Sequence, residues 1–391
     1  GNYIYFSMTF YPKEGFTVTP LAINPDGTIS PWFLIAKYTA GTINKQLYSS
    51  KGLTPACWLG ASPYTNTISH NDGITKAKKR GQFYSIGYFP EYTLIALDCM
   101  IRLGTKNIQD VLKGNTVNDK QYLVSKTEEN VSRVILTNAQ ANNIDVNSYV
   151  SVGDDGTGSV RDRARAELHN IAFCVKVISK EQIDDNYTAL NLDCEPFTTT
   201  KTTLVSTMWE RSGYSDNILG RYGSVGSNTN GRHGAVWNGV EFLTGISEVV
   251  GNAFMDITED GSRDVYFTNN SRELTTNLAD SLNKYQKSNY RIPASGDVWK
   301  YITEVGFDLK NGLFIPTDFG KSGSSSATGY GDAYFASNAT SGQREFILCG
   351  SLATGLASGL WYLSGSSALS GGSWYFGGRL SINCVGGELS E

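Results

Sequence analysis

The chain has 391 residues, of which 42 are glycine, 22 tyrosine, 17 phenylalanine and 7 tryptophan, while charged residues make up only 18%. This composition argues against intrinsic disorder, which requires low hydrophobicity and high charge, and against a helical bundle. The formal net charge of −4 argues against a general nucleic-acid binder, because neutralising phosphates requires clustered Lys and Arg.

In chain order, the first third is expected to mix short strands with two helices. Residues 3–10 and 32–38 are apolar, strand-like runs, and a turn at residues 24–27 separates them. One helix is expected from Asn71–Asp72 to the stop at Gly81, with its lysines on a solvated face. The second begins at Pro90, has apolar residues at helical spacing and ends at Gly104.

The amino-acid composition changes between residues 115 and 203, where charged residues become more frequent and tryptophan is absent. Strand-like runs lie at 131–136, 149–152, 171–178 and 190–192, so we expect an inserted small β domain. Its loop 153–158 lacks the Lys-Ser/Thr of a phosphate loop and predicts a turn. Arg161, Arg163 and Arg165 are expected on a solvated strand or loop, although they could contact a carboxylated partner.

The expected organisation is therefore a main domain built from residues 1–114 and 204–391, interrupted by the insertion 115–203. In the second part, Gly/Ser/Asn loops at 222–230 and 320–331 separate apolar runs such as 242–250 and 299–305. Long loops on a compact scaffold are where binding sites commonly lie.

Sequence motifs for catalysis or metal binding are weak. The three histidines have no nucleophile motif beside them, and the six cysteines include no CxxC pair, which makes a zinc site improbable. Free thiols are expected, with Cys349–Cys384 as the one candidate disulfide. Residues 256–261 resemble a calcium loop only in part, because Phe267 stands where a bidentate Glu is needed, so a turn is preferred. We expect no cofactor, no metal and no membrane insertion, since no apolar run approaches about 20 residues.

The most informative segment is 346–378, which contains no charged residue. It is rich in Gly, Ser, Tyr and Trp, the residue types that adaptable binding loops use. The alternative interpretation is a Gly-rich structural ribbon. Neither interpretation gives the segment a group for acid–base or metal chemistry.

At this segment the chain resembles the C-type-lectin-like tail proteins of bacteriophages, including those diversified by retroelements. The motifs are Cys349-Gly350, then Ala-Ser-Gly-Leu-Trp-Tyr at 357–362, then Ser-Trp-x-x-Gly-Gly-Arg-Leu at 373–380. Upstream, 31–38, the helix from Glu91 with 104–109, and 238–242 followed by Gly251-Asn252 resemble further family stretches in the same order.

The resemblance implies an α+β, C-type-lectin-like fold with two helices, short antiparallel strands and long Gly-rich loops. This fold is similar to that of formylglycine-generating enzymes, but their activity is not implied, because no matching cysteine pair is visible. In retroelement-diversified members, Asn codons in a C-terminal repeat are randomised. Apart from Trp361 and Trp374, residues 351–376 are of types that this process yields, as a plain Gly/Ser-rich loop also would be.

Carried over by position, the framework residues would be Trp361, Tyr362, Trp374, Gly378 and Arg379. The expected ligand contacts are Leu352, Ala353, Thr354, Leu356, Ser358, Ser364, Ser366, Ser370, Ser373, Tyr375, Phe376 and Tyr334, with Tyr330 and Phe335 at the border.

The function implied by the resemblance is host recognition at a phage tail, without enzymatic activity. The expected partners are a bacterial cell-surface protein or glycan and other phage tail proteins, and the protein is expected on the virion, as a homotrimer by family analogy. The alternatives are a tail-associated glycan hydrolase, which would need two facing carboxylates, and a structural virion decoration protein.

Overall fold

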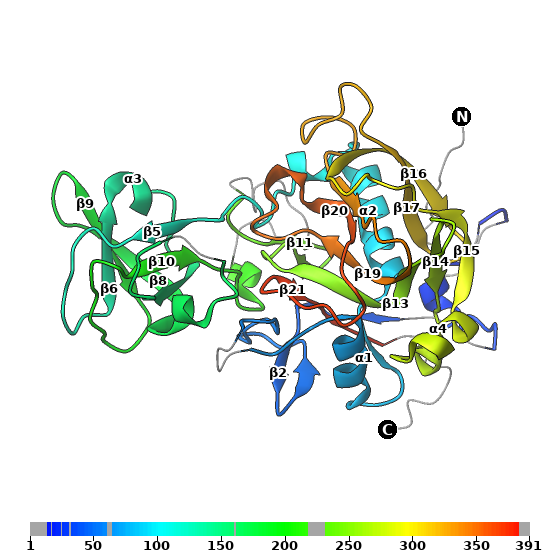
Figure 1. Cartoon of the computed structure of the whole chain (residues 1–391), viewed down its shortest axis with the longest axis horizontal. Helices are drawn as coiled ribbons and strands as arrows, with labels where there is room; N and C mark the ends of the chain where they lie inside the picture. Colours follow the sequence, from blue (N-terminus) through cyan, green and yellow to red (C-terminus); the bar gives the residue numbers. More distant parts are fainter. Residues whose placement is uncertain are drawn as a thin grey trace.

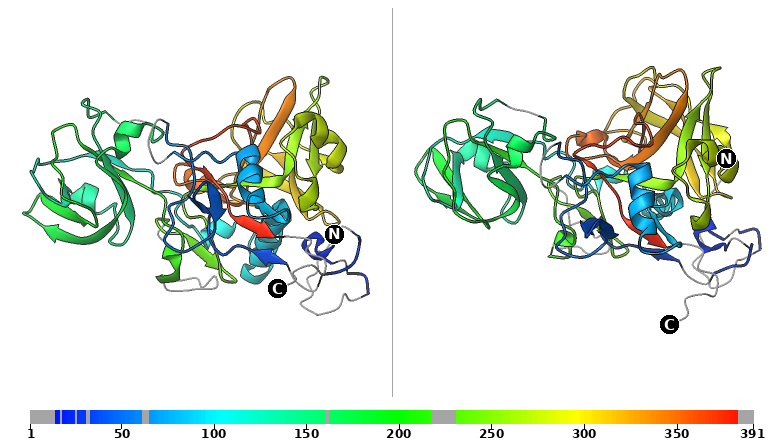
Figure 2. Two further views of the ribbon diagram at one scale, coloured as in Figure 1. Left: turned by 90° about the horizontal axis from the view of Figure 1, so that it is seen from below. Right: turned by 60° about the horizontal axis from the view of Figure 1, so that its bottom comes forward.

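The structure is a computed structural model that describes residues 14–16, 18–24, 26–30, 33–60, 65–159, 162–217 and 231–382. It separates into a smaller lobe, on the left in Figure 1, and a larger body. The two further views in Figure 2 keep the same separation. The expected strand at residues 3–10, the loop at 222–230 and Cys384 lie outside the described residues.

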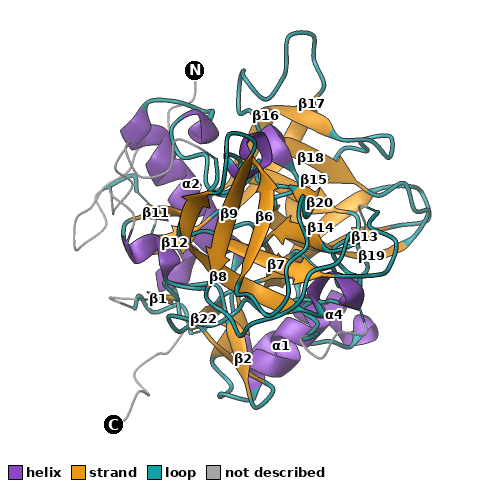
Figure 3. Cartoon of the chain, turned by 90° about the vertical axis from the view of Figure 1, so that its left-hand side faces the viewer, coloured by secondary structure: helices purple, strands orange, loops and turns teal. Residues whose placement is uncertain are grey.

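The smaller lobe is a six-stranded antiparallel sheet with the order β5-β10-β7-β8-β9-β6. Its strands are β5 (Gln121–Leu123), β6 (Arg133–Thr137), β7 (Tyr149–Gly153), β8 (Ala172–Gln182), β9 (Tyr187–Leu192) and β10 (Leu204–Thr207), with α3 (Asn138–Ala141) between β6 and β7 in the chain. The sheet curls until Ser125 N, just after β5, donates to Ile135 O on β6 at 2.7 Å. Figure 3 shows this lobe from its outer side, with β6, β8 and β9 toward the viewer. Valines and leucines facing inward form its own apolar core.

The body is organised around a nine-stranded sheet with the order β15-β14-β13-β19-β20-β18-β16-β17, to which β21 adds beside β13. Its strands are β13 (Ser247–Ile257), β14 (Arg263–Phe267), β15 (Gln286–Arg291), β16 (Lys300–Asp308), β17 (Leu313–Phe319), β18 (Ala333–Ala336), β19 (Gly342–Cys349), β20 (Gly359–Gly365) and β21 (Phe376–Gly377). Three smaller sheets complete the body: β1 (Leu34–Ile35), β22 (Leu380–Ile382) and β4 (Tyr84–Ile86); β2 (Gly41–Ile43) and β3 (Gln46–Tyr48); β11 (Ala235–Trp237) and β12 (Val240–Phe242).

Three helices lie in the body: α1 (His70–Lys78), α2 (Phe89–Leu103) and α4 (Leu278–Lys284). Helix α2 has Pro90 in its first turn and ends at Gly104 in a left-handed conformation, as the sequence predicts. Its apolar face packs on the large sheet, where Phe89 lies 5.0 Å from Phe314 and 5.6 Å from Phe346 between ring centroids. Helix α1 begins one residue earlier than expected, because the Ser69 side chain accepts from Asp72 N and caps it.

The expected α+β class with two helices is wrong. Strands account for 35% of the structure and helices for 15%, the sheets curl into half-barrels, and the described residues contain four α-helices. This composition identifies a β-rich fold. The error has a physical cause: much of the large sheet is built from polar or glycine-interrupted segments. The segment 346–378, expected to supply binding loops, instead forms the end of the central strand β19 and all of β20.

The lobe and the body share an apolar core at their junction. Ala164 and Cys174 of the lobe pack with Trp209, Leu352 and Trp374. The indoles of Trp209 and Trp374 stack with centroids 6.0 Å apart and an interplanar angle of 22°. The junction therefore resembles a continuous protein interior and couples the lobe directly to the C-terminal segment.

Candidate recognition surface

The uncharged segment 346–378 is an integral part of the large sheet of the body. Strand β20 pairs with β19 on one side and with β18 on the other, and all seven of its residues are buried. The loop before β20 is tied to the body by Leu352 N, which donates to Gly245 O at 3.2 Å, and by Gly355 N, which donates to Thr116 O at 2.8 Å. These contacts hold the exposed parts of the segment on a fixed frame.

A buried carboxyl group, Asp332, fixes the start of β20. Its Oδ2 accepts from Trp361 N at 2.7 Å, and burial raises the pKa of Asp332 well above its usual value. Glycine is required at position 359, because a Cβ there would collide with this carboxyl group. The sequence analysis did not identify Asp332, which no motif marks.

The expected ligand contacts fall into three groups of exposure. The buried ones are Leu352, Ser358, Ser364, Phe376 and Tyr334, none more than 4% exposed. Thr354, Ser373 and Tyr375 are half-buried. Ala353, Leu356, Ser366 and Ser370 are exposed.

The buried group cannot touch a ligand in this structure, which corrects the expectation for those five residues. Leu352 belongs to the junction core, and Phe376 packs with Ile86 and Val249. Tyr330 is also buried and Phe335 half-buried, while the expected framework residues Trp361, Tyr362, Trp374, Gly378 and Arg379 are all buried.

The exposed tryptophans mark the outer surface of this segment. Among the tryptophans that the structure describes, only Trp58 and Trp299 are exposed, at 39% and 50%. Trp58 N donates to Ser373 O at 3.1 Å, and the Trp299 indole stacks on the Tyr362 ring with centroids 5.3 Å apart at 27°. Both tryptophans thus lie against the segment 346–378. Sequence reasoning did not select either of them, although Trp299 follows a turn-like Gly-Asp pair, which is a weak signal of exposure.

We call Trp299, Phe335 and Tyr362 the aromatic platform. Phe335 lies 5.0 Å from Trp299 between centroids at 48°, so Tyr362 and Phe335 together support the indole from β20 and β18. Offset and tilted aromatic packing of this kind adds roughly 0.5–1.5 kcal/mol per pair beyond area burial. Two of the three rings thus lie on the paired strands β18 and β20, and Trp299 directly precedes β16.

Hydroxyl groups surround the Tyr362 end of the platform. Burial raises the pKa of Tyr362 well above its usual value and nearby Tyr375 adds to this, while hydrogen bonds with Thr354 and Ser364 oppose it. Ser364 Oγ lies 3.0 Å from Ser366 Oγ, and Ser351 N donates to Thr354 Oγ1 at 2.9 Å. The result is a connected row of hydroxyls that reaches solvent at Thr354 and Ser366.

The carboxyl groups with strongly raised pKa values lie in the interior. Glu91, Glu241 and Glu345 are at most 1% exposed, and burial raises their pKa values, to about 8 for Glu91 and Glu241. Each accepts at least one backbone N–H: from Tyr88, Gly213 and His70, respectively. Their burial and their hydrogen bonds to the backbone are typical of structural groups. These three carboxyl groups therefore do not form an accessible pair on either side of a surface cleft.

Residues 14–382, apart from the gaps named above, hold no group of three His, Cys, Asp or Glu side chains suited to a metal ion. Residues 256–257 end strand β13, and 258–261 form a turn in which Gly261 N donates to Thr258 O at 2.8 Å. In the part of the chain that the structure describes, the helices are too short or too polar to span a bilayer. The five cysteines in that part are free thiols.

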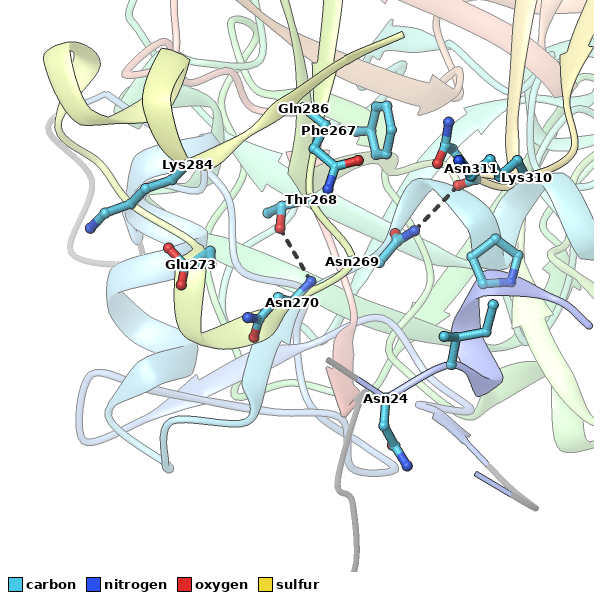
Figure 4. A pocket seen from close by; sticks show the side chains of 12 residues that line it. Asn24, Phe267, Thr268, Asn269, Asn270, Glu273, Lys284, Gln286, Lys310 and Asn311 are labelled. Atoms are coloured by element: carbon cyan, nitrogen blue, oxygen red, sulfur yellow. Dashed lines mark hydrogen bonds between the residues drawn. The ribbon is translucent and has the colours of Figure 1, made fainter. Parts of the chain in front are cut away.

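A polar cleft of about 310 Å³ lies away from the C-terminal segment, between η1 (Pro20–Ala22), η6 (Ser271–Glu273) and the start of β15 (Figure 4). Its side-chain amides are used internally: Asn311 Nδ2 donates to the Asp308 carboxylate at 2.8 Å, and Asn269 Nδ2 donates to Asn311 O at 3.5 Å. The side-chain amides of the cleft thus bond within the protein and hold the surrounding turns together. The aromatic platform is therefore the better candidate for a ligand-binding site.

Because comparisons with known families and curated proteins found no match, the functional interpretation rests on the structure and the sequence motifs. No protein-family model matches the chain, and no curated protein has a similar sequence.

Proposed function

We propose that this protein is a host-recognition protein of a phage tail, which binds a ligand on the bacterial cell surface through the aromatic platform and the exposed residues beside it. The exposed residues are those of the uncharged segment: Ala353, Leu356, Ser366 and Ser370, with Thr354, Ser373 and Tyr375 partly accessible. In this proposal the protein acts on the virion, held by other tail proteins.

One observation carries this proposal: the exposed tryptophans of the described residues both lie against the segment that lacks charge. Exposing a large aromatic ring to water is unfavourable, and rigid aromatics are enriched where proteins bind partners. The motif order that resembles phage tail proteins supports the same conclusion. Several copies, as in a homotrimer, would multiply weak single contacts.

The alternative functions receive less support. A glycan hydrolase needs two accessible carboxyl groups on either side of a bond, whereas Glu91, Glu241 and Glu345 are buried and bonded to backbone. A decoration protein would have no need for a solvent-exposed Trp299 on the aromatic platform.

The proposal is tested by binding fluorescently labelled protein to a panel of whole Gram-negative and Gram-positive bacteria. We expect saturable binding to at least one strain, and at least about tenfold weaker binding for Trp299→Ala, since about 1.4 kcal/mol is one such factor. Leu309→Ala is the matched control. Leu309 is 45% exposed and lies just past the far end of β16, which spans roughly 30 Å. Saturable binding that Trp299→Ala leaves unchanged would overturn the proposal, as would the absence of binding to every strain.

A further inference from the structure

We propose that the aromatic platform binds a neutral saccharide, with a pyranose ring stacked on the exposed part of the Trp299 indole. This inference rests on the proposed function and names the chemical class of its ligand.

The geometry of Trp299 is the first support. Tyr362 covers one face of the indole at 27°, and Phe335 packs beside it, yet half of the side chain remains exposed. The exposed part of the indole is thus available to a ligand and is supported by the two neighbouring rings. An aromatic face carries partial negative charge and attracts the weakly positive C–H groups that line one side of a sugar ring.

The hydroxyl row is the second support. Thr354 and Ser366 reach solvent at the edge of the platform, and behind them stand Ser364 and the Tyr362 phenol. A hydroxyl can both donate and accept, so a row of them matches the hydroxyls of a saccharide, which also do both. A ring stacked on Trp299 would have its polar rim toward this row.

The charge distribution excludes an ionic ligand as the preferred one. The segment 346–378 has no ionisable acid or base other than tyrosine and cysteine, and the sequence neighbours of Trp299 are one acid, Asp297, and one base, Lys300. Neither sign of charge therefore predominates in the sequence next to Trp299. The exposed apolar groups, Val298, Trp299 and Leu356, are interspersed with hydroxyls, unlike the apolar centre of a protein–protein interface.

The inference is tested with immobilised polysaccharides: neutral dextran, mannan and galactan, and anionic alginate and polysialate. We expect binding to at least one neutral polymer, with an affinity that changes less than about twofold between about 50 mM and about 500 mM salt, because no ion pair is screened. Trp299→Ala should weaken it at least about tenfold, Trp299→Phe should retain part of it, and Leu309→Ala should leave it unchanged. Ser366→Ala should weaken it about two- to fivefold through loss of one hydrogen bond.

The cell-binding assay separates failure of this inference from failure of the proposed function. Periodate oxidises vicinal diols of surface glycans, so periodate treatment of the bacteria should abolish binding while protease treatment should not. Trp299-dependent binding that survives periodate and is lost after protease would overturn the saccharide and retain host recognition through a protein. Binding only to the anionic polymers would also overturn the inference.

Discussion

Arg379 and Glu248 form an ion pair in the interior of the body, with 2.7 Å between Arg379 Nη2 and Glu248 Oε1 and only 1% of each side chain exposed. The guanidinium also donates to Glu241 O at 2.7 Å and to Ala36 O at 3.1 Å. On the other side, the Tyr92 hydroxyl donates to Glu248 Oε2 at 3.2 Å. The pair thereby joins the residue before β22 to β12, β13 and helix α2, directly after the segment 346–378 ends.

Breaking this pair from one side should strongly destabilise the protein. Glu248→Gln leaves a buried cation without its counter-ion, and we expect a loss of about 3–5 kcal/mol in the free energy of unfolding. Urea denaturation followed by tryptophan fluorescence measures it. Lys321→Ala is the control, because Lys321 is 53% exposed in its pairs with Glu304 and Asp318 and its removal should lower the stability far less. A Glu248→Gln loss as small as that of the control would contradict the prediction.

Phe376 and Tyr375 should respond differently to truncation, although they are adjacent. Phe376 is 4% exposed and packs with Ile86 and Val249, so Phe376→Ala should cost about 3–5 kcal/mol of stability. Tyr375 is half-buried and meets Trp374 and Phe376 edge-on, so Tyr375→Ala should cost about 1–2 kcal/mol. Thermal unfolding of both variants decides the order. If Phe376→Ala unfolded at the wild-type temperature, its assignment to the core would fail.

The contact between lobe and body at His233 predicts a pH-dependent stability. His233 Nδ1 lies 2.9 Å from Glu210 Oε1, and Nε2 lies 3.4 Å from Asp145 Oδ2 in the lobe, next to Arg232. Burial disfavours the imidazolium, but the two carboxylates outweigh it and raise the pKa of His233 to about 9. The usual value is about 6.5. The stabilisation is therefore complete below pH 6.5 and is lost as the pH rises toward 9.

The free energy of unfolding, measured by urea titration from about pH 6 to about pH 10, should fall through this window. Glu91 and Glu241 also lower the free energy of unfolding as the pH rises to 8. Their raised pKa values mean that the folded state favours the neutral acid. The His233→Gln variant keeps the pH dependence that comes from the glutamates and loses the one that comes from the histidine. The difference in free energy of unfolding between the wild-type protein and this variant therefore isolates the contribution of His233. Parallel curves for the two proteins would refute the prediction.

Those elements that local signals define could be predicted from sequence. Helix α2 has Pro90 at its start and Gly104 at its end, and in the lobe the apolar runs coincide with β6, β7, β8 and β9. Strand β10 was missed because it lies beyond residue 203, where the expected insertion ended, yet it pairs between β5 and β7. Strand pairing across 80 residues leaves no local signal.

The large sheet and the surface residues depend on tertiary context. β15 reads Gln-Lys-Ser-Asn-Tyr-Arg and has no apolar alternation, and β13 contains Gly251-Asn252 at a register shift against β19. Strand β20 is buried on both faces, so alternation cannot separate the buried Ser364 from the exposed Ser366. Trp299 becomes a candidate only when β16 and β18 bring it onto Tyr362.

Arg163 should prove structurally important, in contrast to the solvated position expected for it. Its guanidinium is buried, donates to Thr207 O at 3.1 Å and Lys120 O at 2.8 Å, pairs with Asp119 and lies 5.3 Å from the Trp374 ring centroid. Arg161 lies outside the described residues, whereas Arg165 is exposed and pairs with Glu167.

We expect Arg163→Ala to lower stability by about 3 kcal/mol, since it removes the guanidinium donor from the Thr207 carbonyl and from Asp119, and one of the donors from the Lys120 carbonyl. Arg163→Lys should restore little, because an ammonium group lacks the planar fork that reaches several carbonyls and stacks on an indole. Arg165→Ala is the matched control and should change stability by less than about 0.5 kcal/mol. Urea denaturation measures all three, and the tryptophan emission of the folded state reports the Trp209–Trp374 stack. Full rescue by lysine would show that only the charge of Arg163 matters. Equal losses of stability for Arg163→Ala and Arg165→Ala would contradict the structural role of the buried Arg163 guanidinium.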